Sequence, residues 1–417
     1  MPVWHELAQR LRENHDFVVV GIAQEQHPER CALYATWQRF DWPILWDPFN
    51  LTEAAAVPNV YALDEAGIVR AIRPTPSTFA ADFLERTFPA APSEASSAAP
   101  TTAPVEAPAV DAGAPARVAA VVPQLVECDR TAAGTAEGDM WRSLSRLLFA
   151  DPAKRPWDEA VAVLGSYADD HPDDARAAFR RGVALRMRYD SPQRQSADFQ
   201  GALDAWSEAL AMRPNEYIWR RRIQQYGPAL DKPYPFYPWV DAALQALQER
   251  GEPAPALTAA LTMAERAQPR RSFETAADQS EPDPTGAIVR DDGSWLEVDT
   301  AVAYHTSASK TVARVHVALR PVTTSAVHWN NEAEPLLVWF GDDALPDDWE
   351  LGSRLQRIAG DTSQVVSSEV RSAEVELRLP AGATGTLSGY ALYYACDGVD
   401  GLCTYLRRDF AVTVSAL

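Results

Sequence analysis

Two cysteines near the carboxyl end of the sequence, Cys396 and Cys403, have the type and spacing for sulfur chemistry. Six residues separate them, and Gly398 and Gly401 lie among those six. A loop this short and glycine-containing can bring two Cα atoms within the roughly 4.4–6.8 Å that a disulfide requires. The segments on both sides have strand patterns. This pair is therefore the main candidate for chemistry, as a redox disulfide, a structural disulfide or two free thiols.

The other two cysteines, Cys31 and Cys128, form no Cys-x-x-Cys pair of the kind that binds zinc. We therefore expect no metal site and no cofactor. A disulfide between Cys396 and Cys403 would persist only outside the reducing cytosol, yet the sequence does not open with the basic and apolar regions of an export signal. The cysteines and the first residues thus point to different compartments.

Composition and charge exclude several classes of function. A chain of 417 residues predicts two to four domains, at about 100–200 residues each. A formal net charge of -20 would repel phosphate backbones and anionic lipids, so we expect no nucleic acid partner and no binding to membrane surfaces. The longest apolar runs, such as residues 17–23, are far shorter than the roughly 20 residues that span a bilayer. We therefore expect no membrane span in this chain.

A proline-rich stretch divides the chain. Residues 89–118 consist largely of Ala, Ser, Thr and Pro and contain almost no large apolar side chains. Such a stretch cannot bury enough surface to offset its ordering entropy, and its prolines favour extended backbone. We interpret it as a linker after a first domain of residues 1–88.

The first domain alternates helix and strand patterns. A helical face formed by the apolar residues between Trp4 and Leu11 comes first. We expect the following elements to be a buried strand at 17–23, a helix from Pro28, a strand at 43–46, a hairpin at 59–63 and 68–72, and a helix at 77–88. This order predicts an α/β layer.

This order, with Val57-Pro58 just before a strand, resembles the thioredoxin fold of TlpA-like and redoxin-type thiol reductases. The resemblance implies that Pro58 is the family's cis proline, which faces the redox cysteines and contributes to substrate binding. The alternative is a proline that merely starts a strand. The family's Cys-x-x-Cys motif and first core strand would lie just before Pro2. We therefore expect Met1 to be an internal residue of a longer product that carries an export signal, that strand and the motif.

Cys31 is the remaining thiol of this domain. It lies on a predicted helix beside Tyr34 and Trp37, and we expect it to be a small packing residue, since free cysteine is often buried. The residues before it do not supply the Pro-x-x-x-Thr-x-x-Cys context of peroxiredoxins. A redoxin-type peroxidase is therefore the weakest functional alternative.

The middle segment, residues 138–268, has a helical composition and contains an internal echo. Four residues that end in a proline recur with the same spacing 42 positions later: Ala160, Leu164, Tyr167 and Pro172, then Ala202, Trp206, Ala209 and Pro214. The spacing resembles the second helix of tetratricopeptide repeats, whose small residues let paired helices approach. The resemblance implies a helical surface for a peptide or protein partner. A generic array of helical hairpins is the alternative, and we assign no binding residues.

In the last segment, residues 290–417, the hydrophobic period changes to two. Apolar residues alternate from Trp295 to Tyr304 and from Val312 to Leu319, and further strand patterns follow between turns rich in Gly, Pro and Asp. About seven short strands without intervening helices predict an immunoglobulin-like β-sandwich. The whole chain is thus predicted to be a multidomain protein with α/β, α and β parts.

Two stretches of this segment resemble the periplasmic amino-terminal domain of the thiol:disulfide interchange protein DsbD. Residues 325–331 are similar to that family's Gly-Trp-His-Ile-Asn segment, and residues 393–403 are similar to its cysteine loop. The resemblance implies that Cys396 and Cys403 are the catalytic pair, which passes electrons by thiol–disulfide exchange. This chain has one more residue between the cysteines, and residues 404–406 replace the family's Tyr-Pro-Pro.

Ionisable side chains near the pair in sequence would act on a thiol pKa in opposite directions: Asp397, Asp400 and Asp409 upward, Arg407 and Arg408 downward. His328 either acts near the cysteines or caps a turn with the asparagines that follow it, and the turn is the commoner role.

The leading hypothesis is a periplasmic or otherwise extracytoplasmic thiol–disulfide oxidoreductase whose partners are protein thiols and disulfides. The alternative is a non-catalytic scaffold or binding protein. It would have a degenerate thioredoxin-like domain, a partner-binding helical repeat and a structural disulfide.

Overall fold

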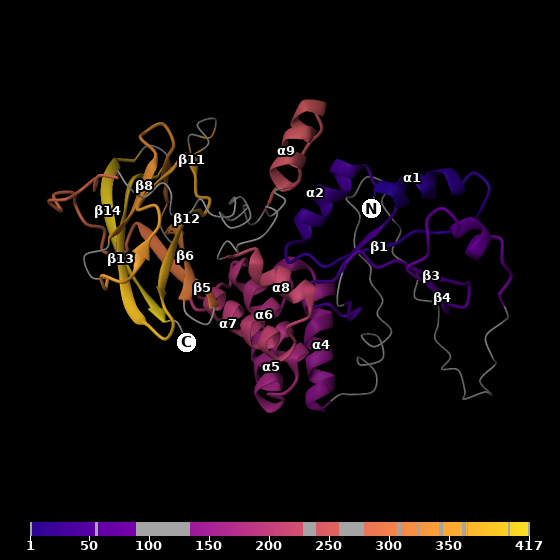
Figure 1. The fold of residues 1–417 in the computed structure, drawn as a ribbon. Coiled ribbons are helices and arrows are strands. Elements are labelled where there is room, and N and C mark those ends of the chain that lie inside the picture. The colour runs from indigo at the N-terminus through magenta and orange to yellow at the C-terminus, as the bar shows by residue number, and fades with distance from the viewer. Residues whose placement is uncertain are drawn as a thin grey trace. The chain divides into compact units, whose positions relative to one another are not determined.

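The computed structural model contains helices and β-sheets (Figure 1). The chain divides into two compact units. The structure describes residues 2–54, 57–88, 134–227, 239–257, 279–306, 310–322, 326–341, 345–360, 364, 366–398 and 401–415. The first unit comprises Met1–Phe149, Asn215–Ile218 and Trp239–Ala259, and the second comprises Ala150–Pro214, Trp219–Pro238 and Ala260–Leu417. The predicted linker, residues 89–118, and Cys128 lie outside the described residues.

The first unit combines helices with short strands. Its helices are α1 (Pro2–Leu11), α2 (Pro28–Gln38), α4 (Ala136–Phe149) and α9 (Trp239–Arg250), with a π-helical segment, η1, at Ala80–Leu84. Its strands are β1 (Gly21–Ala23), β2 (Ile44–Trp46), β3 (Tyr61–Leu63) and β4 (Val69–Ile72). β1 and β2 pair in parallel, whereas β3 and β4 form an antiparallel hairpin. From α1 to η1, the elements follow the order predicted from the sequence.

The predicted strand at 17–23 is shorter and more exposed than expected. Only Gly21–Ala23 forms a strand, and the side chains of Val18 and Ile22 are 78% and 49% exposed. A strand is buried only where other layers cover both of its faces, and the core of this unit instead gathers around α1 and β3. The prediction of a buried strand here is therefore wrong.

The helices of the second unit pack closely through a glycine. They are α5 (Trp157–Asp170), α6 (Ala175–Tyr189), α7 (Asp198–Met212) and α8 (Tyr217–Gln224), whose first two residues belong to the first unit, and a short 3-10 segment, η2 (Pro152–Lys154), precedes α5. Gly182 of α6 faces Trp206 of α7, and a Cβ at Gly182 would lie 2.5 Å from the indole ring. The missing side chain therefore allows the buried Trp206 to fill the space between the helices.

Two antiparallel sheets form the rest of the second unit. One has the order β5-β6-β12-β9. In the other, β8 and β7 pair with successive parts of one edge of β13, and β14 pairs with the other edge. β10 and β11 extend this sheet beyond β8 and β7, respectively. The strands are β5 (Leu296–Thr306), β6 (Lys310–Pro321), β7 (Val327–Asn330), β8 (Leu336–Gly341), β9 (Glu350–Leu351), β10 (Leu355–Ile358), β11 (Val366–Ser367), β12 (Arg371–Pro380), β13 (Thr384–Asp397) and β14 (Cys403–Ser415).

One hydrophobic core lies between these sheets. Alternate residues of β6 and β12, such as Val315 and Val375, meet Trp329, Val338 and Leu387 of the other sheet. The period-two pattern of the sequence corresponds to this arrangement, because successive strand residues point to opposite faces. We call the two sheets and the segment that precedes them the two-sheet domain, residues 279–415.

Within the second unit, the helices cover part of the outer face of β5 and β6. The Gln200 side chain of α7 accepts a hydrogen bond from the Val302 amide at 2.8 Å and donates one to the Val302 carbonyl at 3.2 Å. His316 of β6 donates through Nε2 to the Tyr226 carbonyl at 2.6 Å, and the Phe199 ring lies 5.3 Å from the imidazole. His316 is buried under this cover, and burial lowers its pKa.

Candidate functional site

A disulfide joins Cys396 and Cys403 at the end of the β13–β14 hairpin. The two residues are directly opposite each other in the last pair of the ladder, and their Cα atoms are 4.0 Å apart. Gly398 follows β13 with a φ of 77°, a left-handed conformation that glycine adopts without a steric penalty. The predicted proximity of the two cysteines is confirmed, although their Cα separation is slightly below the expected range.

The two sulfur-bearing residues differ in exposure. Cys396 lies on a central strand, between β14 and β7, and is 5% exposed. Cys403 begins β14 and is exposed, and its neighbour Leu402 is 79% exposed. A partner can therefore approach Cys403 from outside, whereas Cys396 is almost completely buried.

A histidine stands on the other side of Cys396. His328 of β7 is directly opposite Cys396 in the β13–β7 ladder. Directly opposed residues in an antiparallel pair share a face, with Cβ atoms about 4.5–5.5 Å apart. His328, Cys396 and Cys403 therefore form one row across three adjacent strands and on one face of the sheet.

The Ala326 carbonyl connects the histidine to the cysteine loop. It lies 3.3 Å from Nδ1 of His328 and accepts a hydrogen bond from the Gly398 amide at 3.0 Å. When Nδ1–H donates to this carbonyl, Nε2 is the ring nitrogen that gains or loses the second proton. Asn330, rather than His328, caps the turn after β7, because its side-chain oxygen accepts from the amides of Glu332 and Ala333.

Two tyrosines form the next row on the same face. Tyr394 and Tyr405 are opposite each other, and their rings stack with centroids 4.4 Å apart. Each lies two residues from a cysteine, so its side chain shares the cysteine face. Burial raises the pKa of Tyr405. This aromatic pair was not predicted, although the period of two places Tyr394 on the same face as Cys396.

The two arginines considered above do not act on the sulfurs at close range. Arg407 is four residues from Cys403 along β14, which corresponds to about 13 Å. Its guanidinium lies 2.8 Å from a carboxylate oxygen of Asp283 and 2.7 Å from one of Asp409, and it holds the pKa of Asp283 below its usual range. Arg408 points to the opposite face and donates to the Asp291 carbonyl at 3.1 Å. Of the three aspartates, Asp400 lies outside the described residues.

The other predicted site residues lie in the first unit. The Val57–Pro58 peptide bond is cis, as predicted, and Pro58 is exposed. Cys31 is buried in α2, with its sulfur 3.9 Å from the His27 carbonyl oxygen, which matches a packing role. The structure therefore brings together Cys396, Cys403 and His328, while Pro58 belongs to a different unit from the cysteines.

No protein-family model matches this chain. No curated protein matches it either. Among solved structures, the chain is similar to the crystal structure of the GAE domain of GGA2p from Saccharomyces cerevisiae, with 12% identity and a TM-score of 0.19. That match covers 31% of this chain and 98% of the GAE chain.

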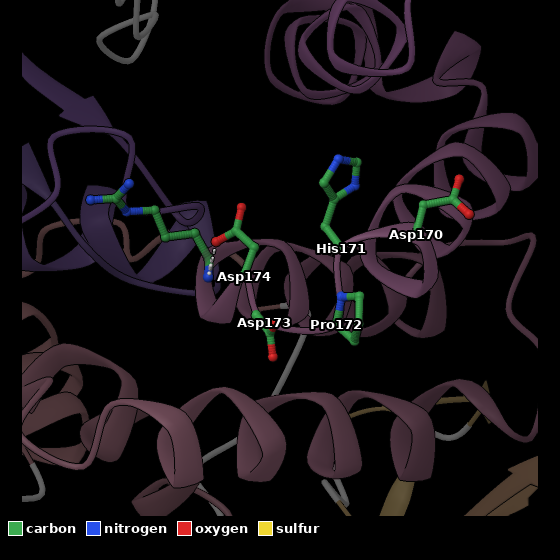
Figure 2. Close-up of a pocket in the computed structure, with 6 residues that line it drawn as sticks. Asp170, His171, Pro172, Asp173 and Asp174 are labelled. Atoms are coloured by element: carbon green, nitrogen blue, oxygen red, sulfur yellow. Dashed lines mark hydrogen bonds between the residues drawn. The ribbon is translucent and has the colours of Figure 1, made fainter.

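An open depression lies at the turn between α5 and α6 (Figure 2). Half of its lining is acidic, and the lining residues are Asp170, His171, Pro172, Asp173, Asp174 and Arg176. Local roles account for two of these side chains, because Asp174 caps α6 at the Arg176 amide and the His171 ring stacks on Tyr167. In the part of the chain that the structure describes, no cluster of His, Cys, Asp and Glu could hold a metal ion. Among the same residues, no helix has the length and apolar character needed to cross a bilayer.

Proposed function

We propose that the two-sheet domain exchanges its Cys396–Cys403 disulfide with the thiols of partner proteins outside the cytosol. The observation that carries the proposal is the unequal exposure of the two sulfur-bearing residues, with Cys403 open to solvent and Cys396 shielded. Thiol–disulfide exchange requires one accessible sulfur for attack and one sulfur that leaves. A bond with one exposed end meets this requirement and fixes the direction of attack.

The exchange is a two-step transfer of two electrons. A thiolate of a partner dithiol attacks Sγ of Cys403, the bond to Cys396 breaks, and Cys396 leaves as a thiolate. The partner's second thiolate then attacks the partner sulfur of the mixed disulfide and releases Cys403 as a thiolate. The partner ends as a disulfide, the domain ends as a dithiol, and its thiolates take up two protons from solvent.

The finer fold assignments belong to the same proposal. The parallel β1–β2 pair, the hairpin β3–β4 and the helices around them support a thioredoxin-like first domain. The equivalent positions of Trp206 and Leu164 in α7 and α5, with α6 between them, support a tetratricopeptide-like repeat. Two antiparallel sheets with a cysteine hairpin support an immunoglobulin-like, DsbD-like last domain. The combination favours a thiol–disulfide oxidoreductase over a passive scaffold.

The test uses the full chain with Cys31→Ala and Cys128→Ser, so that only the proposed pair reacts. The oxidised protein is incubated with reduced thioredoxin, and free thiols are counted by alkylation and intact mass. We expect both Cys396 and Cys403 to become alkylated under native conditions. A bond that opens only in urea would overturn the proposal and identify a structural disulfide in a binding scaffold.

A matched pair of single variants tests the direction of attack. In the same background, Cys396→Ala retains the exposed thiol and Cys403→Ala retains the shielded one. With oxidised glutathione as the probe, we expect the first variant to form a mixed disulfide at least tenfold faster, because reactivity requires access to the sulfur. Equal rates would contradict the assignment of Cys403 as the attacked residue.

A further inference from the structure

We infer that His328 is the proton acceptor for the Cys396 thiol. The inference rests on the proposed exchange reaction and assigns the group that prepares the shielded cysteine to close the disulfide. Its basis is the row of His328, Cys396 and Cys403 across β7, β13 and β14. Because the two ladders fix the register, this row follows from the backbone pairing of the sheet.

The shielded position of Cys396 creates the need for a local base. Cys396 and His328 are 5% and 7% exposed, so a proton leaving the thiol has little direct access to water. Burial without a charge partner disfavours a thiolate, whereas a neighbouring imidazolium stabilises it. His328 is the titratable group directly opposite Cys396, and its Nδ1 contact with the Ala326 carbonyl leaves Nε2 to accept the proton.

The other ionisable groups around this face have different surroundings. The described groups nearest in register or in sequence are Asp397, Glu334, Tyr394, Tyr405 and Arg407. Arg407, four residues from Cys403 along β14, is paired with acidic groups. Burial raises the pKa of Tyr405, and the Glu334 charge raises it further. Asp397 follows Cys396 and is exposed, and a carboxylate there opposes rather than favours a thiolate. β11 contributes Val366 and Ser367 to the far edge of β7 and adds no charge.

The proposed step is balanced within the site. The Cys396 thiol gives its proton to Nε2 of His328, which yields a thiolate and an imidazolium. The thiolate attacks Sγ of Cys403 in its mixed disulfide with a partner, the Cys396–Cys403 bond forms, and the partner leaves as a thiolate. The imidazolium then releases its proton to solvent. No other oxidant is needed, because the mixed disulfide supplies the oxidising equivalents.

The test measures the closing step as a function of pH. The reduced full chain, with Cys31→Ala and Cys128→Ser, is mixed with Ellman's reagent, which first modifies the exposed Cys403. Attack by Cys396 then releases a second nitrothiobenzoate, whose absorbance is followed by stopped flow. The comparison is His328→Gln against His305→Gln, because His305 is exposed and lies on β5 of the other sheet.

We expect His328→Gln to move the pH midpoint of closing upward by at least one unit, while His305→Gln leaves it unchanged. Near pH 7, closing should slow about threefold for each unit, because the thiolate fraction falls tenfold while nucleophilicity rises with a Brønsted slope of about 0.4–0.5. At high pH, where both proteins have the thiolate, the order should reverse, and His328→Gln should close about threefold faster for each unit because its thiolate is the more nucleophilic.

Superimposed profiles would overturn the inference, and so would a slowing by one constant factor at every pH, which indicates a merely structural role. Ellman's reagent supplies the mixed disulfide, so this result does not depend on whether reduced thioredoxin opens the bond. Failure of the proposed function and failure of the role of His328 are therefore distinguishable.

Discussion

Reduction of the Cys396–Cys403 bond should leave the two-sheet domain folded and should loosen only the end of the β13–β14 hairpin. The cysteines are 7 positions apart in sequence, so the bond closes a loop of about eight residues. In the chain-entropy model, such a loop contributes about 2.5 kcal/mol, which is small beside the burial of the core between the sheets. The ladder from Thr384 opposite Ser415 up to the cysteines does not depend on the bond.

Amide hydrogen exchange, followed peptide by peptide, measures this local effect in a protein of several parts. The oxidised chain is compared with the reduced chain and with a Cys396→Ala, Cys403→Ala double variant. We expect exchange near residues 396 and 403 to accelerate by at most about 70-fold, which is the equivalent of 2.5 kcal/mol. Peptides from β6 and β12 should keep their protection and serve as the internal control.

Loss of protection in β6 and β12 on reduction would refute this reasoning. It would mean that the bond holds the whole domain together, and a bond of that kind cannot open and close during normal use. The double variant separates this outcome from a chemical effect of the reductant, because it lacks the bond under all conditions.

Two further predictions concern packing and protonation in the second unit. Gly182→Ala should lower the free energy of unfolding by about 1–3 kcal/mol, because its Cβ would overlap the Trp206 ring, whereas Gly165→Ala, at an open position in α5, should be neutral or stabilising by up to about 1 kcal/mol. Urea unfolding followed by circular dichroism compares them, and equal effects would contradict the close-approach argument. The lowered pKa of His316 means that the unfolded chain binds the extra proton first, so stability should fall as pH drops below about 6.5, by at most about 1.4 kcal/mol per unit. Thermal unfolding between pH 5 and 8 should show a flatter profile for His316→Gln than for His305→Gln, and identical profiles would rule out this origin.

The sequence was sufficient for the hairpin that carries the disulfide, because its determinants are local. Strand alternation on both sides and glycines in a short loop already place Cys396 and Cys403 at the same level. The helices α5 and α7 could also be predicted from the sequence, since their repeated spacing of small and large residues reflects contacts with one neighbouring helix.

Contacts between residues far apart in the sequence could not be predicted from such local patterns. The position of His328 opposite Cys396 depends on the pairing of β7 with β13, and no local pattern encodes that register. The burial of Val18 was predicted wrongly for the same kind of reason. An apolar run indicates a strand but does not reveal whether other layers will cover it.

The helical cover on β5 and β6 has a practical consequence for preparing the redox module by itself. A fragment that begins at residue 290 would lack Gln200 and Tyr226. The Val302 backbone and the His316 imidazole would then hydrogen-bond to water instead. Such a fragment would expose His316 and the part of β5 and β6 that the helices cover in the full chain. A soluble preparation therefore needs the helices retained from residue 150 onward, or polar replacements at the uncovered positions.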